Sequence, residues 1–290
     1  MSAEAGPGPP DHGPLAIICG AGTLPFAVAD AVRKRGREVV LFALRGWADP
    51  QRVAAYKHYW GALGQFGRFC RQVRAEGCRD IVFIGTIARP QLWRVRFDWG
   101  TLRILPRVVA AYRGGDNHLL SGVARAFEQE GFRLLGAHEV APDILVPPGV
   151  LSKRQPNAQD RADMAQGLCL LEAIGKFDVG QAVVVAGNHV LAVEGVEGTD
   201  KMLERVAELR QRQIGGAGGV LVKAPKPGQD FRFDLPSIGP QTIESAARAG
   251  LAGIAVIARA SIMAEPQRVS AMADAHNIFV VGANADGTVG

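Results

Sequence analysis

An apolar run that leads through a glycine turn into a helix constrains the fold of this chain most strongly. Residues 15–19 are apolar and have the length of a buried strand, and Gly20-Ala-Gly22-Thr-Leu-Pro25 follows directly. Residues 26–35 then have a helical pattern, and residues 38–44 form a second strand-like run. Strand, tight turn, helix and strand in this order predict a βαβ unit with parallel strands. We therefore expect a sheet with helices on its faces and right-handed crossovers.

Strand-like and helical segments alternate along the whole chain, and a proline-rich segment divides it. Residues 141–149 include three prolines, which disfavours regular structure. We expect a disordered tail over 1–13, an N-terminal α/β domain over 14–140 and a C-terminal α/β domain over 141–290. Further strands are predicted over 80–85, 132–135, 181–186, 189–194, 219–224, 253–258 and 278–282, and further helices over 67–76, 102–112, 119–130, 158–176, 199–212 and 242–249.

The composition is that of a well-packed protein with room for two cores. The 290 residues are 48% hydrophobic and 21% charged, which fits two domains and excludes a disordered chain. The formal net charge is +5. Without a basic arm or zinc-finger spacing this charge does not predict nucleic-acid binding, and we expect no nucleic-acid partner. It suits a phosphorylated substrate or an anionic membrane surface.

The cysteines and the first residues indicate the compartment. Cys19, Cys70, Cys78 and Cys169 form no CxxC pair, so we expect no disulfide framework, as in a reducing cytosol. Residues 1–13 are rich in Gly and Pro, unlike a signal peptide or an anchor. No apolar run reaches the roughly 18 residues that span a bilayer. We expect a soluble, cytoplasmic protein.

The glycine turn at Gly20 and Gly22 is the first candidate site. Glycines at a strand-to-helix turn let the backbone approach a phosphate, and the helix N-terminus favours an anion. The dinucleotide fingerprint is incomplete, because Phe26 and Ala27 stand where a third glycine is needed and no acidic residue ends the next strand. A tight turn without a ligand explains the motif equally well.

Two polar motifs precede predicted helices. Gly114-Gly115-Asp116-Asn117-His118 suits metal or phosphate contact, and a helix cap explains it equally well. Glu194-Gly195-Val-Glu197-Gly198-Thr199-Asp200 places three carboxylates within seven residues, a repulsive arrangement unless a cation neutralises it. Mg²⁺ prefers such oxygen ligands. The alternative is an N-cap at Thr199 or Asp200 with solvated acids, although helix capping does not explain Glu194 and Glu197.

The segment 221–239 is the most informative. Lys223 and Lys226 flank prolines, and Asp230, Arg232 and Asp234 alternate with apolar residues. In an extended segment a period of two places these three charged side chains on one face and Phe231, Phe233 and Leu235 on the other. The polar face suits a metal and a phosphate, and the lysines suit developing phosphate charge. A plain surface strand is the alternative, although such strands rarely carry so many prolines and glycines.

Other motifs narrow the class of protein. Trp93-Arg-Val-Arg-Phe-Asp-Trp99 mixes cationic and aromatic residues, as a phosphate-binding rim, a membrane-facing loop or an ordinary amphipathic surface does. The sequence contains no GxSxG nucleophile elbow, HExxH or Walker A motif. The sequence therefore does not predict a serine hydrolase, a zinc protease or a P-loop protein.

Four motifs, in order along the chain, resemble those of the LpxI-type UDP-2,3-diacylglucosamine pyrophosphatases. The resemblance covers nearly the whole chain after the tail, and the last two motifs are long and specific. That family usually has two aspartates after Gly115, whereas this chain has Asp116-Asn117, and the uncharged Asn117 weakens a metal role there. The motifs are Gly20-x-Gly22-x-Leu24-Pro25, Gly115-Asp116-x-x-Leu119-Leu120, Glu194-Gly195-x-Glu197-Gly198-Thr199-Asp200, and Lys223-x-x-Lys226-Pro227-x-Gln229-Asp230-x-Arg232-Phe233-Asp234-Leu235-Pro236-x-Ile238-Gly239.

The resemblance implies a hydrolase of bacterial lipid A biosynthesis. Such enzymes use Mg²⁺ to hydrolyse the pyrophosphate bond of UDP-2,3-diacylglucosamine to UMP and 2,3-diacylglucosamine 1-phosphate (lipid X). The resemblance also implies a Rossmann-like N-terminal domain with a parallel sheet, a C-terminal catalytic domain of a distinct α/β fold, and a homodimer. A substrate with two acyl chains allows peripheral contact with the cytoplasmic face of the inner membrane.

The roles of individual residues follow from the needs of pyrophosphate hydrolysis, namely charge neutralisation, a positioned water and a stabilised leaving phosphate. Our hypothesis is that Asp230 and Asp234, with Glu194 or Glu197, hold Mg²⁺ or orient the water. Lys223 and Arg232 would stabilise phosphoryl oxygens. The candidate substrate-binding residues are Gly20, Gly22, Thr23, Leu24, Asp116, Asn117, Thr199 and Gln229.

Two other functions compete with this interpretation. The first is a nucleotide-sugar or acyl-lipid binding protein without catalysis, which would bind the same substrate and release no UMP. The second is an NAD-dependent oxidoreductase, which only the N-terminal glycines suggest. The missing third glycine and the missing ribose-binding acid count against the oxidoreductase.

Overall fold

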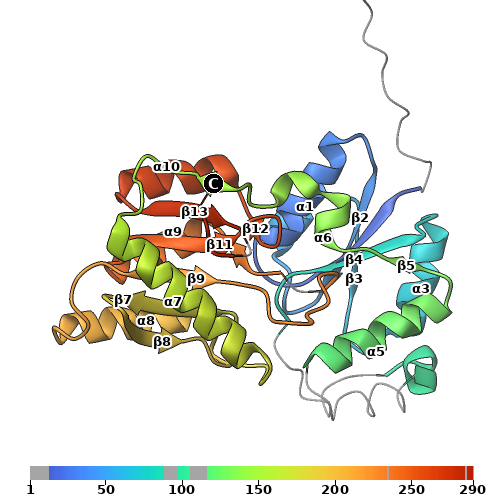
Figure 1. Ribbon diagram of the computed structural model, residues 1–290. Helices are drawn as coiled ribbons and strands as arrows, with labels where there is room; N and C mark the ends of the chain where they lie inside the picture. Colours follow the sequence, from blue (N-terminus) through green and yellow to red (C-terminus); the bar gives the residue numbers. More distant parts are fainter. Residues whose placement is uncertain (1–12, 88–96, 105–115, 234, 285, 290) are drawn as a thin grey trace, which may run out of the picture. The chain divides into compact units, whose positions relative to one another are not determined.

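The structure is a computed structural model of the chain (Figure 1). It describes residues 13–87, 97–104, 116–233, 235–284 and 286–289, and for residues 116–121 it describes the backbone alone. The chain divides into two compact units. The first unit comprises residues 1–142 together with the short segment 230–233, and the second comprises 143–229 and 234–290.

The first unit is built on a five-stranded sheet in which every described pair of strands is parallel. Its strand order is β3-β2-β1-β4-β5, so after β3 the chain crosses to β4, which lies on the other side of β1. The strands are β1 (Leu15–Cys19), β2 (Val39–Leu44), β3 (His58–Gly61), β4 (Asp80–Ile84) and β5 (Arg133–Leu134). The helices are α1 (Leu24–Lys34), α2 (Pro50–Val53), α3 (Phe66–Ala75), α5 (Asp116–Gln129) and α6 (Ala137–Val140), and residues 99–104 are also helical.

Burial explains why these residues form a sheet between helices. All residues of β1 and β2 are buried, as expected for strands with helices on both faces. On α3, Phe66, Phe69, Cys70 and Val73 recur at the spacing of one helical face and pack into the core. Phe127 of α5 joins this cluster with its ring 4.7 Å from that of Phe66.

Two ion pairs of a buried aspartate lie near the amino ends of β2, β4 and β5. Asp80, at the start of β4, is 1% exposed. Its carboxylate accepts hydrogen bonds from Arg37 at 2.7 Å and from Arg133 at 2.8 and 2.9 Å. Burial alone raises the pKa of the Asp80 carboxyl, but the hydrogen bonds from Arg133 and Arg37 outweigh it and hold the pKa below its usual value.

The second unit is built on a mixed six-stranded sheet of order β6-β13-β11-β9-β7-β8. Strands β9, β11 and β13 are parallel, while β7 runs antiparallel to β8 and β9, and β6 antiparallel to β13. The strands are β6 (Gly149–Val150), β7 (Ala182–Ala186), β8 (His189–Val193), β9 (Val220–Lys223), β11 (Gly253–Ile257) and β13 (Phe279–Ala283), and β10 (Ser237–Ile238) pairs with β12 (Ile262–Met263). The helices are α7 (Ala158–Gly175), α8 (Gly198–Gln211), α9 (Pro240–Arg248) and α10 (Pro266–Ala275).

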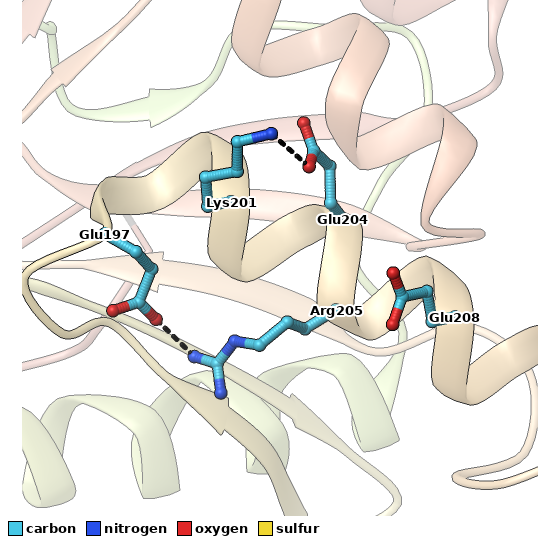
Figure 2. A pocket seen from close by; sticks show the side chains of 5 residues that line it. All are labelled: Glu197, Lys201, Glu204, Arg205 and Glu208. Atoms are coloured by element: carbon cyan, nitrogen blue, oxygen red, sulfur yellow. Dashed lines mark hydrogen bonds and ion pairs between the residues drawn. The ribbon is translucent and has the colours of Figure 1, made fainter.

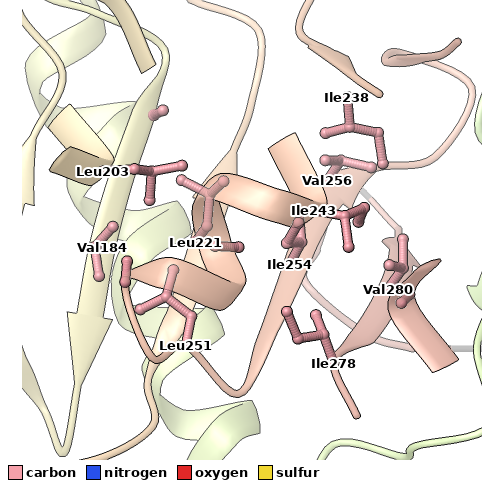
Figure 3. Close-up of a cluster of buried hydrophobic side chains, with 14 of the residues drawn as sticks. Val184, Leu203, Leu221, Ile238, Ile243, Leu251, Ile254, Val256, Ile278 and Val280 are labelled. Carbon is pink, nitrogen blue, oxygen red and sulfur yellow. The ribbon is translucent and has the colours of Figure 1, made fainter. Parts of the chain in front are cut away.

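Two hydrophobic clusters cover the two faces of this sheet. On one face, side chains of α8, α9 and α10 pack against the strands, as Leu203, Ile243 and Val256 illustrate (Figure 3). On the other face, Met164 and Leu171 of α7 pack against the alternate residues of the same strands. The period of two in each strand thus divides the apolar residues between two layers of helices.

The predicted parallel sheet of the N-terminal half and the separate α/β fold of the C-terminal half are confirmed. Each predicted strand matches an observed one. Residues 102–104 of the predicted helix 102–112 are helical, and residues 105–112 lie outside the described part, as do residues 1–12 of the predicted tail. In the described ranges, no helix is long and apolar enough to cross a membrane. Sequence reasoning missed α2, β3, α6, β6, β10, β12 and α10.

Candidate functional site

The glycine turn lies at the carboxyl edge of the first sheet, where β1 and β4 end side by side. Gly20 donates to Ile84 O at 2.8 Å, and Ala21 and Thr86 form a reciprocal backbone bridge. A Cβ added to Gly20 would lie 2.8 Å from the backbone of Gly85. Gly20 is therefore needed because two loops meet backbone to backbone. In open parallel sheets, this point between two diverging crossovers is where ligands bind.

The turn then enters α1 with exposed donor groups. Gly22 has φ +96° and open space around it, a conformation that favours glycine. Thr23 is the N-cap of α1 and makes no side-chain cap hydrogen bond with the described residues, and Leu24 and Pro25 begin the helix. Helix N-termini in this state attract anions. The predicted substrate contacts Gly20, Gly22, Thr23 and Leu24 are thus together at one edge.

The segment 230–233 also belongs to the first unit, but it is not extended. Residues 231–233 form a turn, in which Phe233 N donates to Asp230 O at 3.1 Å and Arg232 N donates to Asp230 Oδ1 at 3.0 Å. An aspartate that accepts from the second residue after it favours such turns. The predicted alternation of a polar and an apolar face is therefore wrong, and Phe231 is 39% exposed.

Asp230 and Arg232 form a bidentate pair. The guanidinium donates from Nη2 to Oδ2 at 2.7 Å and from Nε to both carboxylate oxygens at 3.0 and 3.1 Å. These hydrogen bonds lower the pKa of Asp230 and raise that of Arg232. The carboxylate is thus held ionised and oriented by its own neighbour in the turn.

Three contacts tie the turn to the rest of the first unit. Arg232 Nη1 donates to Glu128 Oε1 of α5 at 2.9 Å. The ring of Phe233 lies 5.8 Å from that of Phe83 on β4. The ring of His138 on α6 stands perpendicular to that of Phe231 at 6.3 Å, and its positive form would lower the pKa of Asp230 further.

Glu128 and His138 were not predicted from the sequence. Glu128 lies 104 residues before Arg232, and no local pattern announces such a pairing. His138 could have been found, because it closely follows β5 at the carboxyl edge of a parallel sheet, where functional side chains gather.

The lysine segment of the second unit is shaped by prolines. Lys223, at the end of β9, is 5% exposed, and its Nζ donates to Ser237 O at 2.8 Å. Pro227 and Gly228 (φ +73°) occupy the central positions of a turn that Gln229 N closes onto Lys226 O at 3.1 Å, the signature of a type II turn. The Gln229 side chain accepts from Lys226 N at 2.7 Å.

Glu194 and Thr199 meet in the second unit. The Glu194 carboxylate is buried and accepts from Thr199 Oγ1 at 2.6 Å and from Gln181 N at 2.7 Å. It thus joins the start of β7 to the first turn of α8. Both oxygens have a protein donor, so this geometry favours a structural role for Glu194 over that of a metal ligand.

Glu197 is the N-cap residue of α8 and lies beside charged side chains of that helix (Figure 2). It forms an ion pair with Arg205 at 2.6 Å, and Lys201 pairs with Glu204 at 2.6 Å. These residues and Glu208 line a shallow open depression. A hydrogen bond from its own backbone N–H, with the charge of Arg205, lowers the pKa of Glu197. The clustered carboxylates were expected to need a neutralising cation. For Glu197, Arg205 provides that charge.

The described residues do not form a preorganised metal centre. No group of three His, Cys, Asp or Glu side chains among them could hold an ion. Asp234 lies outside the described residues, and so do the side chains of Asp116 and Asn117 at the start of α5. Of the predicted set, the structure places Asp230 and Arg232 in the first unit, and Glu194, Glu197, Thr199, Lys223 and Gln229 in the second.

Comparisons with known proteins cover both halves of the chain. The model described as the LpxI N-terminal domain matches residues 14–144, and the model described as the LpxI C-terminal domain matches residues 147–281. The UDP-2,3-diacylglucosamine pyrophosphatase LpxI of Caulobacter vibrioides is 42% identical over 274 residues, which cover 92% of this chain and 96% of that protein.

Proposed function

The chain belongs to the LpxI family, and we propose that it hydrolyses the pyrophosphate bond of UDP-2,3-diacylglucosamine to UMP and 2,3-diacylglucosamine 1-phosphate, a step of lipid A biosynthesis. The observation that carries this proposal is the 42% identity to a pyrophosphatase of that name over nearly the full length of both chains. A match of this extent includes both domains, so the proposal does not rest on one shared module.

The first unit supplies a place for the charged part of such a substrate. The turn at Gly20 and Gly22 and the N-terminus of α1 offer backbone donors at the carboxyl edge of the sheet. Hydrolysis adds water to one phosphorus and breaks its bond to the bridging oxygen, so negative charge gathers on the leaving phosphate. Preorganised donors at this point stabilise that charge in the transition state.

Arg232 is proposed to donate hydrogen bonds to the phosphates of the substrate while it orients Asp230. A guanidinium has five N–H donors, and the bonds to Asp230 and Glu128 engage three of them. Asp230, Glu128 and Arg232 together carry a net charge of about −1 when ionised. Arg232 therefore does not act as an isolated cation. Lys223 remains the second proposed contact to phosphoryl oxygens.

Asp230 fits a ligand or orienting group better than a general base. Its pKa is held below the usual range by Arg232, whereas an efficient general base has a pKa near the working pH. An ionised carboxylate can hold a cation or orient a water through its charge. We therefore propose that Asp230 acts through its charge, as a cation ligand or by orienting the water, and does not remove the proton.

Mg²⁺ dependence is part of the proposal. Mg²⁺ in phosphate sites is commonly held by one or two carboxylates together with substrate phosphates and water. A preformed set of three protein ligands is therefore not required, which agrees with the isolated carboxylates of the described residues. Asp230 and Asp234 are the proposed ligands. When bound, the ion would neutralise charge on the pyrophosphate.

The compartment and the assembly are proposed on separate grounds. All four cysteines are free thiols, which suits a reducing cytoplasm. A homodimer is proposed from the family resemblance. Light scattering of the purified protein would test this oligomeric state.

Incubation of the purified chain with Mg²⁺ and UDP-2,3-diacylglucosamine tests the activity. Chromatography should show UMP and 2,3-diacylglucosamine 1-phosphate appearing in equal amounts. Saturable binding of the substrate without release of UMP would instead support a nucleotide-sugar or acyl-lipid binding protein.

A further inference from the structure

The net positive charge of the chain is concentrated in one segment of its sequence. Residues 88–113 include six arginines and a single acidic residue, Asp98. Their net charge of +5 equals that of the whole chain, so basic and acidic residues balance elsewhere. The arginines alternate with Trp, Leu, Val and Ile rather than forming a polar arm. Basic and apolar residues mixed in this way are typical of segments that lie on membrane surfaces.

The described part of this segment, residues 97–104, is held firmly on α3. The Asp98 carboxylate accepts from Arg68 N at 2.8 Å, from Gly67 N at 3.3 Å and from Thr101 N at 2.8 Å. Thr101 is buried, and its Oγ1 accepts from Phe66 N at 3.0 Å. Burial alone raises the pKa of Asp98, but the hydrogen bonds from Thr101 and Arg68 outweigh it and lower the pKa.

This anchoring presents apolar side chains to solvent. Trp99 is 82% exposed, Leu102 43% and Phe97 37%. Trp99 and Leu102 are three residues apart on the helical stretch 99–104, so they lie on the same side of it. Arg103, which follows Leu102, is exposed, and so is Arg68, whose backbone N–H donates to Asp98. Because Asp98 is engaged as a cap, the exposed side chains of residues 97–104 are apolar and basic.

We propose that Phe97, Trp99, Leu102 and Arg103 form an interfacial anchor that docks on an anionic phospholipid bilayer. Trp is favoured at the boundary between headgroups and acyl chains, where its ring is amphipathic. Arginines near the surface are attracted by anionic headgroups. The role of the anchor in reaching the substrate rests on the proposed function, because a substrate with two acyl chains partitions into a bilayer. Binding of the protein to vesicles can be measured without any turnover of that substrate.

Sedimentation with vesicles tests this anchor on the full chain. The wild-type protein should bind vesicles that contain phosphatidylglycerol and bind more weakly to pure phosphatidylcholine or at high salt. Trp99→Ala should bind at least about tenfold more weakly, and Arg103→Gln about fivefold more weakly on the anionic vesicles alone. Phe177→Ala, which removes an exposed aromatic residue of the second unit, is the matched control and should bind normally.

Three results would overturn the proposal. One is the absence of wild-type binding to anionic vesicles, and another is an equal loss in Trp99→Ala and Phe177→Ala. The third is a change of oligomeric state in Trp99→Ala with vesicle binding intact, which would assign the surface to a second copy of the chain. Leu102→Ala, checked for folding by circular dichroism, repeats the test. UMP release from detergent-solubilised substrate should be unchanged in Trp99→Ala, and its absence in the wild type would contradict the proposed activity without touching the anchor.

Discussion

Arg232 holds Asp230 through a bidentate pair of hydrogen bonds across a single turn, and its remaining guanidinium nitrogen binds Glu128 of a helix 104 residues earlier in the chain. The acidic segment of the C-terminal half is thereby fixed on the N-terminal unit. The orientation of a candidate catalytic carboxylate thus depends on a contact that is distant in sequence.

The geometry of this pair is testable with Arg232→Lys. A lysine keeps the charge but cannot reproduce the planar contact with two carboxylates, so Asp230 loses its orientation. We expect the rate of UMP release to fall about tenfold to a hundredfold, with little change in melting temperature. Arg74→Lys, at an exposed ion pair with Glu130, is the matched control, and an equal loss there would show that the effect is not specific to the site.

The stability of the first unit should depend on pH through Asp80. Its folded pKa is below the unfolded value, so the ion pairs with Arg37 and Arg133 stabilise the protein above about pH 4. This contribution is lost as the pH falls through the folded pKa. Asp80→Asn should lower the free energy of unfolding by about 2–3 kcal/mol at pH 7, as measured by urea denaturation.

The acid range provides the check on this prediction. The difference between wild type and Asp80→Asn should shrink as the pH is lowered below about 4. A difference that stays constant with pH would show that packing, rather than ionisation, is lost. Glu130→Gln, at the exposed pair with Arg74, should cost less than about 1 kcal/mol.

Glu194→Gln separates a structural from a metal-binding role. Because Glu194 accepts from Thr199 and Gln181 N, loss of its charge should lower the free energy of unfolding by about 1–2 kcal/mol. We expect the Mg²⁺ concentration for half-maximal activity to be unchanged. A large rise in that concentration, with stability unaffected, would restore the predicted role as a ligand.

Removal of Mg²⁺ should separate catalysis from folding. Chelation with EDTA is expected to bring UMP release to background, while the melting temperature stays within about 2 °C, because Glu194 and Asp230 each accept hydrogen bonds from protein donors. Restoration of the rate by added Mg²⁺ is the control. Full activity in EDTA would show that hydrolysis does not require a divalent cation.

Much of the fold was predictable because its signals are local. The strand, glycine turn and helix at 15–35 have a strong pattern, and β1, β2, β11 and β13 are continuous apolar runs that burial requires. Strand β3 was missed because its four residues are half-buried and lack that pattern. Helix α10 was missed because its residues are mostly small or polar and few are apolar. It also begins after Glu265, a residue with φ +54°.

Local patterns in the sequence singled out candidate site residues but did not predict their geometry. The density of charge and proline pointed to Asp230 and Arg232, yet the period-two prediction failed because the Asp230 carboxylate bonds to Arg232 N and stabilises a turn. Glu128 and His138 join the segment through packing of helices onto the sheet. Such contacts depend on tertiary structure, which no local pattern encodes.

The initial rate of UMP release by wild type and by Asp234→Ala, with equal folding verified by circular dichroism, is the most direct test of the proposed hydrolysis. We expect Mg²⁺-dependent release of UMP from UDP-2,3-diacylglucosamine by the wild type and its loss in the variant. Near-normal release by Asp234→Ala, or binding of the substrate by the wild type without release, would contradict it.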